Sequence, residues 1–110
     1  MTLEPNLLKG NLDLILLSIL EPGAHYGLEI VKEAQARTDG YFDFKEGSLY
    51  PALHRLTQQG LLEAEFRYSP RGGAPVRYYQ LTTSGRKALL DKREAFKRFN
   101  QSVEALWERA

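Results

Sequence analysis

The sequence predicts an α+β fold that is mostly helical, with one β-hairpin and a long C-terminal helix. Apolar residues recur at helical spacing before residue 60. The pattern then changes to strand-like alternation in residues 61–68 and 76–82. Residues 83–110 contain no proline and carry apolar residues seven apart. We therefore expect a small domain over residues 1–82, followed by a dimerisation helix over residues 83–110.

Composition limits the class of protein. A chain of 110 residues with 43% hydrophobic residues can bury one compact core and has no room for a second. The absence of cysteine excludes disulfides and fits a reducing, cytoplasmic location. No export signal is visible, and the most apolar stretch is too short to span a bilayer, so we expect no membrane partner. With a net charge of +1, a nucleic-acid site would have to arise from local clustering of Arg and Lys.

Two helices are predicted first. Residues 7–20 are apolar on almost every face, which indicates a helix covered on more than one side. The segment Glu21–Gly23, with sequence EPG, ends that helix because proline cannot continue its hydrogen bonds. Residues 26–37 have apolar and charged faces typical of a surface helix. The following TDGYFDF segment predicts a loop with a few extended residues.

A third helix is expected in the stretch GSLYPALHRLTQQGLL, residues 47–62. Leu49, Ala52, Leu53 and Leu56 follow the spacing of a core-facing stripe. Proline is tolerated in the first turn of a helix, so we place the N-cap at Ser48 and the end at Gly60. The side chains that point away from the core are Ser48, Pro51, His54, Arg55 and Gln58, with Tyr50 on the flank. For an isolated helix this would be an ordinary solvated face.

A hairpin follows the third helix. Its strands are LLEAEFRY and VRYYQLT, and its loop SPRGGAP carries Arg71 at the tip with Gly72 and Gly73. Arg67 and Arg77 lie on the flanking strands, and no acidic residue occurs from Phe66 to Thr83. Strand alternation sends one ring of the pair Tyr78 and Tyr79 inward.

Helix, loop, helix and a hairpin with a basic tip is the element order of a winged helix. In such a fold one helix enters the major groove of DNA, and the wing lies along the backbone or minor groove. In a winged helix the outward face of the third helix would contact DNA, since its side chains can reach phosphates or base edges. Ser48 at a helix N-terminus would favour a phosphate. The alternative is a winged helix that binds protein instead of DNA, which would present an uncompensated apolar patch on the wing.

The stretch GSLYPALHRLTQQGLL, followed by RYYQLTTSG, resembles the signature of the PadR family of bacterial transcriptional regulators, and HYGLEI resembles its second-helix motif. The resemblance implies a winged-helix homodimer that binds a palindromic operator, usually as a repressor, and is released by a small, often aromatic, molecule. It implies no cofactor. By motif position, Tyr50, Pro51 and Arg55 fall in the helix that reads DNA, with Arg55 on a phosphate. The wing positions are Gly72, Gly73, Arg77, Tyr78 and Tyr79.

The final helix predicts an interface between two copies of the chain. Leu89, Phe96 and Val103 recur every seven residues, and Phe99 and Leu106 form a second row. The domain before this helix has its own core, so a projecting apolar stripe is best covered by a partner. The first helix is expected to share the interface. The residues assigned to it are Leu8, Leu12, Ile15, Leu89, Phe96, Phe99, Val103, Leu106 and Trp107.

Phe96 and Phe99, beside the first helix, could also line a pocket for a flat ligand. An aromatic stripe at helical spacing is more often plain core packing. An enzymatic function finds no support, because neither His25 nor His54 lies in a nucleophile motif or at metal-ligand spacing. We therefore expect neither catalysis nor a metal.

Overall fold

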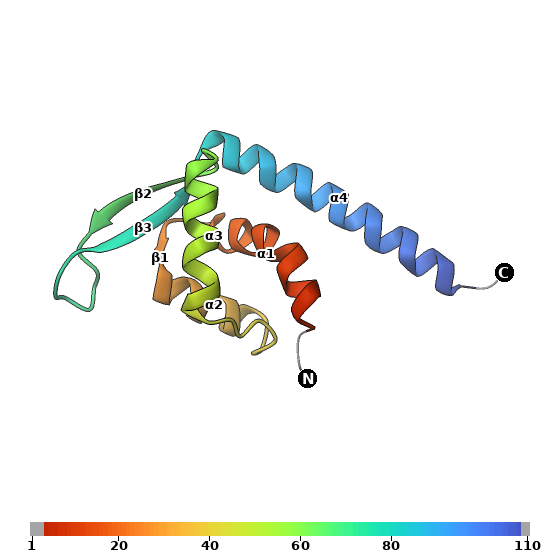
Figure 1. Cartoon of the computed structure of the whole chain (residues 1–110), viewed down its shortest axis with the longest axis horizontal. Helices are drawn as coiled ribbons and strands as arrows, with labels where there is room; N and C mark the ends of the chain where they lie inside the picture. The colour runs from red at the N-terminus through yellow and green to blue at the C-terminus, as the bar shows by residue number, and fades with distance from the viewer. Residues whose placement is uncertain (1–3, 109–110) are drawn as a thin grey trace.

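The computed structural model describes residues 4–108. Its elements follow in the order α1 (Pro5–Leu20), β1 (His25–Tyr26), α2 (Gly27–Arg37), α3 (Glu46–Gln58), β2 (Leu62–Arg67), β3 (Val76–Leu81) and α4 (Thr83–Trp107). Figure 1 shows α1, α2 and α3 gathered in one body, the β2–β3 hairpin extending to one side and α4 to the other. The predicted α+β fold with a long C-terminal helix is confirmed.

The first helix ends where the sequence predicts. The Glu4 carboxylate accepts hydrogen bonds from the amides of Asn6 and Leu7, at 3.0 and 2.9 Å, and caps the N-terminus of α1. At the other end the segment Glu21–Gly23 leaves the helix, and the Gly23 amide donates to the Leu20 carbonyl at 3.2 Å. The turn brings the chain directly into β1.

The end of α3 is also as predicted. Gly60 has φ +78°, a conformation that suits glycine because it has no Cβ. The Gly60 amide donates to the Thr57 carbonyl and the Leu61 amide to the Leu56 carbonyl, both at 3.0 Å. This pair of bonds is a Schellman motif, which satisfies the last carbonyls of the helix and turns the chain into β2.

The sheet has three strands in the order β1-β3-β2, both pairs antiparallel. The hairpin of β2 and β3 is confirmed, whereas β1 was not predicted. A strand of two residues is too short to show alternation, and it forms because β3 offers His25 and Tyr26 a partner edge. Residues 42–45, predicted as loop, form no strand.

The core joins every helix to the sheet. Tyr79 is buried and Tyr78 is half-buried, which confirms that alternation sends one ring inward. No polar side chain among the described residues is buried. The largest fully buried side chains are Leu16, Leu17, Leu20, Ile30, Leu49, Leu53, Leu56, Leu62 and Leu89.

The start of α4 is fixed against the turn between α3 and β2. The Thr82 hydroxyl accepts from the Gly85 amide at 2.9 Å and donates to the Gly60 carbonyl at 2.6 Å. Gly85 lies so close to the Leu61 carbonyl that a Cβ could not fit there. Farther along, the Arg93 guanidinium forms a bidentate ion pair with Glu21 at the end of α1. These contacts set the direction in which α4 leaves the domain.

The molecule is elongated because α4 projects from it. The principal extents are 60 × 32 × 21 Å and the Cα radius of gyration is 15.6 Å, against about 13 Å expected for a compact chain of this length. The helix α4 starts at Thr83, and its residue Leu89 belongs to the core shared with the preceding elements. The outer limits of the two predicted segments, residues 1 and 110, lie outside the described residues. No helix in the described part of the chain is long and apolar enough to cross a membrane.

Candidate DNA-binding surface

One face of α3 is free of the core. Leu49, Ala52, Leu53 and Leu56 are buried as predicted. At about 100° per residue, the side of the helix directly opposite them carries the exposed residues Gly47, Pro51, His54 and Gln58. These positions are available to a groove of DNA.

The predicted N-cap of α3 is wrong. The helix begins at Glu46, with Lys45 at the cap position, and Ser48 already donates its amide to the Lys45 carbonyl at 3.1 Å. Pro51 is therefore the sixth helical residue, one turn later than expected. The helix tolerates it because Gly47, whose carbonyl would otherwise pair with the missing N–H, is exposed to water. Ser48 is an exposed first-turn residue and not the capping group.

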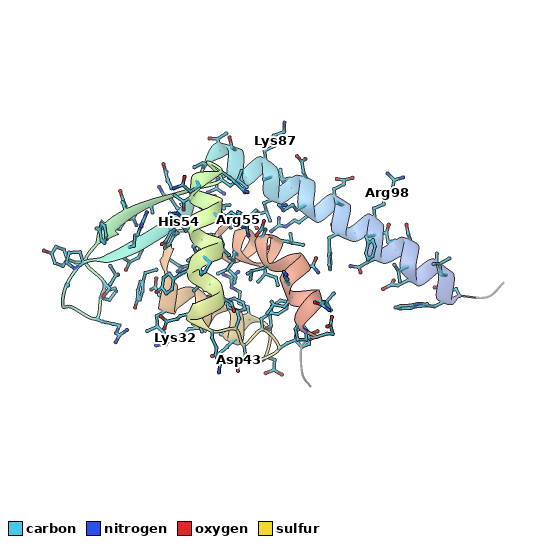
Figure 2. All side chains as sticks on the ribbon, in the orientation of Figure 1. Lys32, Asp43, His54, Arg55, Lys87 and Arg98 are labelled. Carbon is cyan, nitrogen blue, oxygen red and sulfur yellow. The ribbon has the colours of Figure 1, made fainter. Side chains whose placement is uncertain are left out.

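The two flanks of α3 have different neighbours. Figure 2 shows His54 on the side toward the hairpin and Arg55 on the side toward α1. The Arg55 guanidinium donates through Nη2 to Asp13 Oδ1 at 2.6 Å and through Nη1 to Oδ2 at 2.9 Å. This bidentate pair lowers the pKa of the Asp13 carboxyl, and the nearby Lys92 lowers it further. The family motif places Arg55 on a phosphate, and helical geometry alone would equally allow a contact with guanine. In the structure Arg55 instead links α3 to α1.

Tyr50 packs against the start of α2. Gly27 is buried beneath the Tyr50 ring, and a Cβ at Gly27 would overlap the phenol. Partial burial raises the pKa of Tyr50, and the Glu46 carboxylate raises it further. The phenol is thus protonated at neutral pH and can donate a hydrogen bond.

The hairpin has two chemically different faces. Register pairs Leu62 with Leu81, Ala64 with Tyr79 and Phe66 with Arg77, and these six residues share the face that packs on the core. That face carries no carboxylate. The hairpin's carboxylates lie on the other face, where Glu65 pairs with Arg67 and Glu63 accepts a hydrogen bond from Gln80. Arg67 also lies 5.2 Å from the Tyr78 ring centre, so it is engaged on the outer face.

The tip of the hairpin is basic and shaped by glycine. Gly72 and Gly73 have φ of +78° and +83°, and the Gly72 amide donates to the Ser69 carbonyl at 3.0 Å. Arg71 is exposed beside them. On β3, the exposed Arg77 lies 5.7 Å from the Tyr79 ring centre and continues the carboxylate-free face toward the tip.

Two lysines near this surface were missed by sequence reasoning. Lys45 directly precedes α3, and Lys32 lies on the exposed side of α2 (Figure 2). An N-cap placed three residues earlier would have indicated Lys45, because it brings this lysine to the N-terminal end of the exposed face. Nothing in the local pattern distinguishes Lys32 from an ordinary surface lysine.

The predicted interface between copies divides into exposed and buried residues. Phe99, Leu106 and Trp107 on α4 are 67, 81 and 72% exposed. Leu89 and Ile15 are instead 1 and 9% exposed within a single chain, so little of either side chain is left for a partner. Both residues belong to the chain's own core.

Two grooves are lined in part by α1. An apolar groove of about 470 Å³ lies among α1, α2 and α4, and Phe96 lines it together with Leu8, Ile15 and Phe42. The second groove lies between α1 and α4 and is lined by Phe96, Phe99, Lys9, Lys92 and the Asp13–Arg55 pair. The two predicted pocket residues therefore share only the second groove. No cluster of three or more metal-binding side chains occurs in the described residues.

A helix presented by two others and flanked by an antiparallel hairpin defines a winged helix-turn-helix protein. The model of the transcriptional regulator PadR-like family matches residues 16–91. The chain therefore belongs to this family, whose members regulate transcription and bind DNA, generally as dimers. Membership agrees with the expectation that the chain is not an enzyme.

Individual relatives agree with the family assignment. An uncharacterized protein of Lysinibacillus sphaericus is 33% identical over 84 residues, 76% of each chain. A transcriptional regulator of Mycobacterium tuberculosis is 42% identical over 57 residues, 52% of this chain and 51% of the relative.

Solved structures share the whole fold. A transcriptional regulator from Clostridium thermocellum has a TM-score of 0.83 at 28% identity, covering 94% of this chain and 99% of its own. A PadR family transcription regulator from Clostridium difficile has a TM-score of 0.76 at 30% identity, covering 90 and 100%. A PadR-like regulator from Bacillus cereus has a TM-score of 0.81 at 26% identity, covering 96 and 99%.

Proposed function

We propose that this PadR-family regulator acts as a homodimer that reads a two-fold symmetric operator and represses transcription from it. The observation that carries the proposal is the pairing of two surfaces. The outward face of α3 bears hydrogen-bonding side chains, and the adjoining face of the hairpin bears Arg77 and no carboxylate. A duplex, with phosphates along both grooves, is the complementary ligand. This function would place the protein in the cytoplasm.

The proposed roles follow from position on α3. His54 and Gln58 lie at the centre of the exposed face and are the base readers. Tyr50, on the flank toward the hairpin, donates to a phosphate, and Pro51 and Ser48 contact the backbone of the groove. Arg71 beside Gly72 and Gly73, together with Arg77, holds the phosphates beside the wing.

The proposed dimer covers the apolar surface of α4. Phe96, Phe99, Val103, Leu106 and Trp107 have no cover in one chain or are only half-buried. Leu8 and Leu12 on α1 are also half-buried, and Leu8 lines the same groove as Phe96. Burial of these side chains against a second copy would remove a projecting apolar surface from water.

The proposed effector is a small aromatic or hydrophobic molecule that releases the repressor from its operator. The supporting observation is the apolar groove of about 470 Å³ that Phe96 lines, a volume within the range of small-molecule sites. The second groove adjoins Arg55 on α3, so an occupant beside Phe99 would lie next to the DNA-reading helix.

A protein-binding module is the second candidate, and one observation favours it. Phe66 and Tyr68 on the hairpin are 70 and 76% exposed. An apolar patch on the wing is the feature expected of a protein contact. Arg77 is paired in register with Phe66, Arg71 lies in the loop of the same hairpin, and Glu63 and Glu65 are on its other face, so DNA is the better partner.

Selection of preferred sites from a random duplex pool tests the proposal. We expect the wild type to enrich a palindrome whose half-site centres lie about 10 bp apart or a multiple of that. His54→Ala and Gln58→Ala should each relax the base preference at one position in each half-site. The expected loss of binding free energy at that position is about 1–3 kcal/mol. Lys87→Ala, on the exposed surface of α4 (Figure 2), is the control and should change nothing.

Two results would count against DNA reading. If the wild type enriches no palindrome, α3 does not read a two-fold site. If it enriches one but neither substitution alters the enriched sequence, other residues are the readers and the assigned roles of His54 and Gln58 are wrong.

A further inference from the structure

Phe66 and Tyr68 are exposed in a way that the fold does not explain. Leu62 and Ala64, on the same face of β2 as Phe66, pack on the core, but the hairpin continues past the body of the domain (Figure 1). Phe66 therefore stands on the core-facing side of the strand with no core beneath it, at 70% exposure. Tyr68 follows the strand directly and is 76% exposed. Burial of these rings against a partner would be favourable.

The charges around the two rings select the kind of partner. Phe66 is paired in register with Arg77 across the hairpin, and Arg71 is at the tip. No acidic residue occurs from Phe66 to Thr83. The carboxylates of Glu63 and Glu65 belong to the opposite face, since each alternates with the residues of the aromatic face. An anionic ligand can approach this face without repulsion.

We propose that Phe66 and Tyr68 are DNA contacts that enter the minor groove beside each half-site and pack against its deoxyribose walls. This inference rests on the proposed function. The minor groove offers apolar sugar edges between two rows of phosphates, which matches aromatic rings flanked by arginines. The rings add affinity that the arginines do not supply.

The aromatic and basic contacts have different salt signatures. A bound phosphate releases counterions, so Arg71→Ala should reduce the slope of log K against log salt by about 0.9 for each phosphate that the variant no longer binds. A ring against sugars releases none. Phe66→Ala should therefore weaken binding on the order of ten-fold or more, the burial of one aromatic ring, and leave the salt slope unchanged.

The test combines titration with hydroxyl-radical footprinting on the selected operator. Phe66→Ala and the double variant Phe66→Ala/Tyr68→Ala should lose protection of the deoxyriboses that flank each half-site and keep protection inside it. Phe66→Leu, which retains apolar bulk, should keep part of both the affinity and the flanking protection. Leu90→Ala, an exposed apolar residue on α4, is the matched control and should behave as the wild type. Because both rings are exposed, the variants keep the core.

The possible outcomes separate the inference from the function on which it rests. If the wild type binds the operator and the double variant binds equally well with an unchanged footprint, the rings do not contact DNA. If the double variant keeps its DNA affinity but sediments differently, the patch is a contact between proteins, and the inference is overturned. If the wild type binds no duplex, the proposed function fails first, and the inference with it.

Discussion

Arg55 is held by the protein itself before any DNA arrives. Two of its N–H groups bind both oxygens of Asp13, and the guanidinium keeps the pKa of that carboxyl below its ordinary value. Asp13 therefore stays ionised at neutral pH, and the pair persists. A bidentate carboxylate presents the same geometry as a phosphate. Arg55 would have to exchange Asp13 for a phosphate, or turn outward from it, to take the role that its motif position implies.

Asp13→Asn tests whether this exchange occurs. Loss of the carboxylate charge should free Arg55, raise affinity for all duplexes, and steepen the salt slope by about 0.9 for each additional phosphate bound. The free energy of unfolding should fall by about 1 kcal/mol or less, since the pair is partly exposed. Titrations at several salt concentrations measure the slope.

A general charge effect must be separated from a specific one. Asp91→Asn removes the same charge from the exposed surface of α4 and should not change the slope. The gain from Asp13→Asn should disappear in the double variant Asp13→Asn/Arg55→Ala. If the double variant keeps the steeper slope, Arg55 is a link between α1 and α3 and not a DNA contact.

Long helices could be predicted from the sequence. The exact start of a helix and contacts between residues far apart in the chain could not. The stripe of Leu49, Ala52, Leu53 and Leu56 defined α3 and its free face because helical periodicity repeats over several turns. The start of α3 was misplaced because Pro51 suggested a first turn, whereas solvent exposure of Gly47 allows it in the second. The Asp13–Arg55 pair joins residues 42 apart in the chain, and no local pattern signals such a contact.

The junction between α3, β2 and α4 depends on close backbone packing at Gly85. A Cβ at this position would meet the Leu61 carbonyl well inside contact distance, and backbone cannot move aside as a flexible side chain can. Gly85→Ala should therefore lower the free energy of unfolding by roughly 1–3 kcal/mol despite the better helix propensity of alanine. Thermal unfolding measures the effect, which should appear as a lower Tm.

Gly10→Ala is the matched control for that prediction. Gly10 lies within α1, and a Cβ there would have open space around it. This substitution should leave the free energy of unfolding unchanged or raise it by up to about 1 kcal/mol, the difference in helix propensity between glycine and alanine. The Tm should therefore stay the same or rise. Equal Tm values for the two variants would mean that the junction can open to admit a methyl group, and that α4 is not fixed there.

At the scale of the whole molecule, α4 begins within the core of its own chain and ends with exposed apolar side chains. The sequence stripe of α4 runs from Leu89 to Leu106, so spacing alone could not separate residues of the chain's own core from those left for a partner. The separation depends on where the body of the domain ends. Leu89, early in α4, is buried, whereas Leu106, near its end, is exposed. Figure 1 shows the C-terminal part of α4 extending beyond the body of the domain. The same rigid helix would fix the distance between two α3 helices in a dimer.

Phe99→Glu tests the dimer and its consequence for operator binding together. A carboxylate at the centre of the exposed stripe would be buried without a partner, so the variant should sediment as a monomer at micromolar concentration, where the wild type should be a dimer. Leu106→Glu should act in the same direction, and it keeps the test decisive if Phe99→Glu is insoluble. Gln101→Glu adds the same charge at an exposed polar position of α4 and should remain dimeric.

The monomeric variants should lose the strong preference for a two-fold site but keep weak binding to any duplex. Each chain retains its own α3 and wing, but the second half-site is no longer bound by a linked copy. A wild type that stays monomeric at micromolar concentration would refute the proposed homodimer. A dimeric Phe99→Glu variant would instead move the interface away from this stripe.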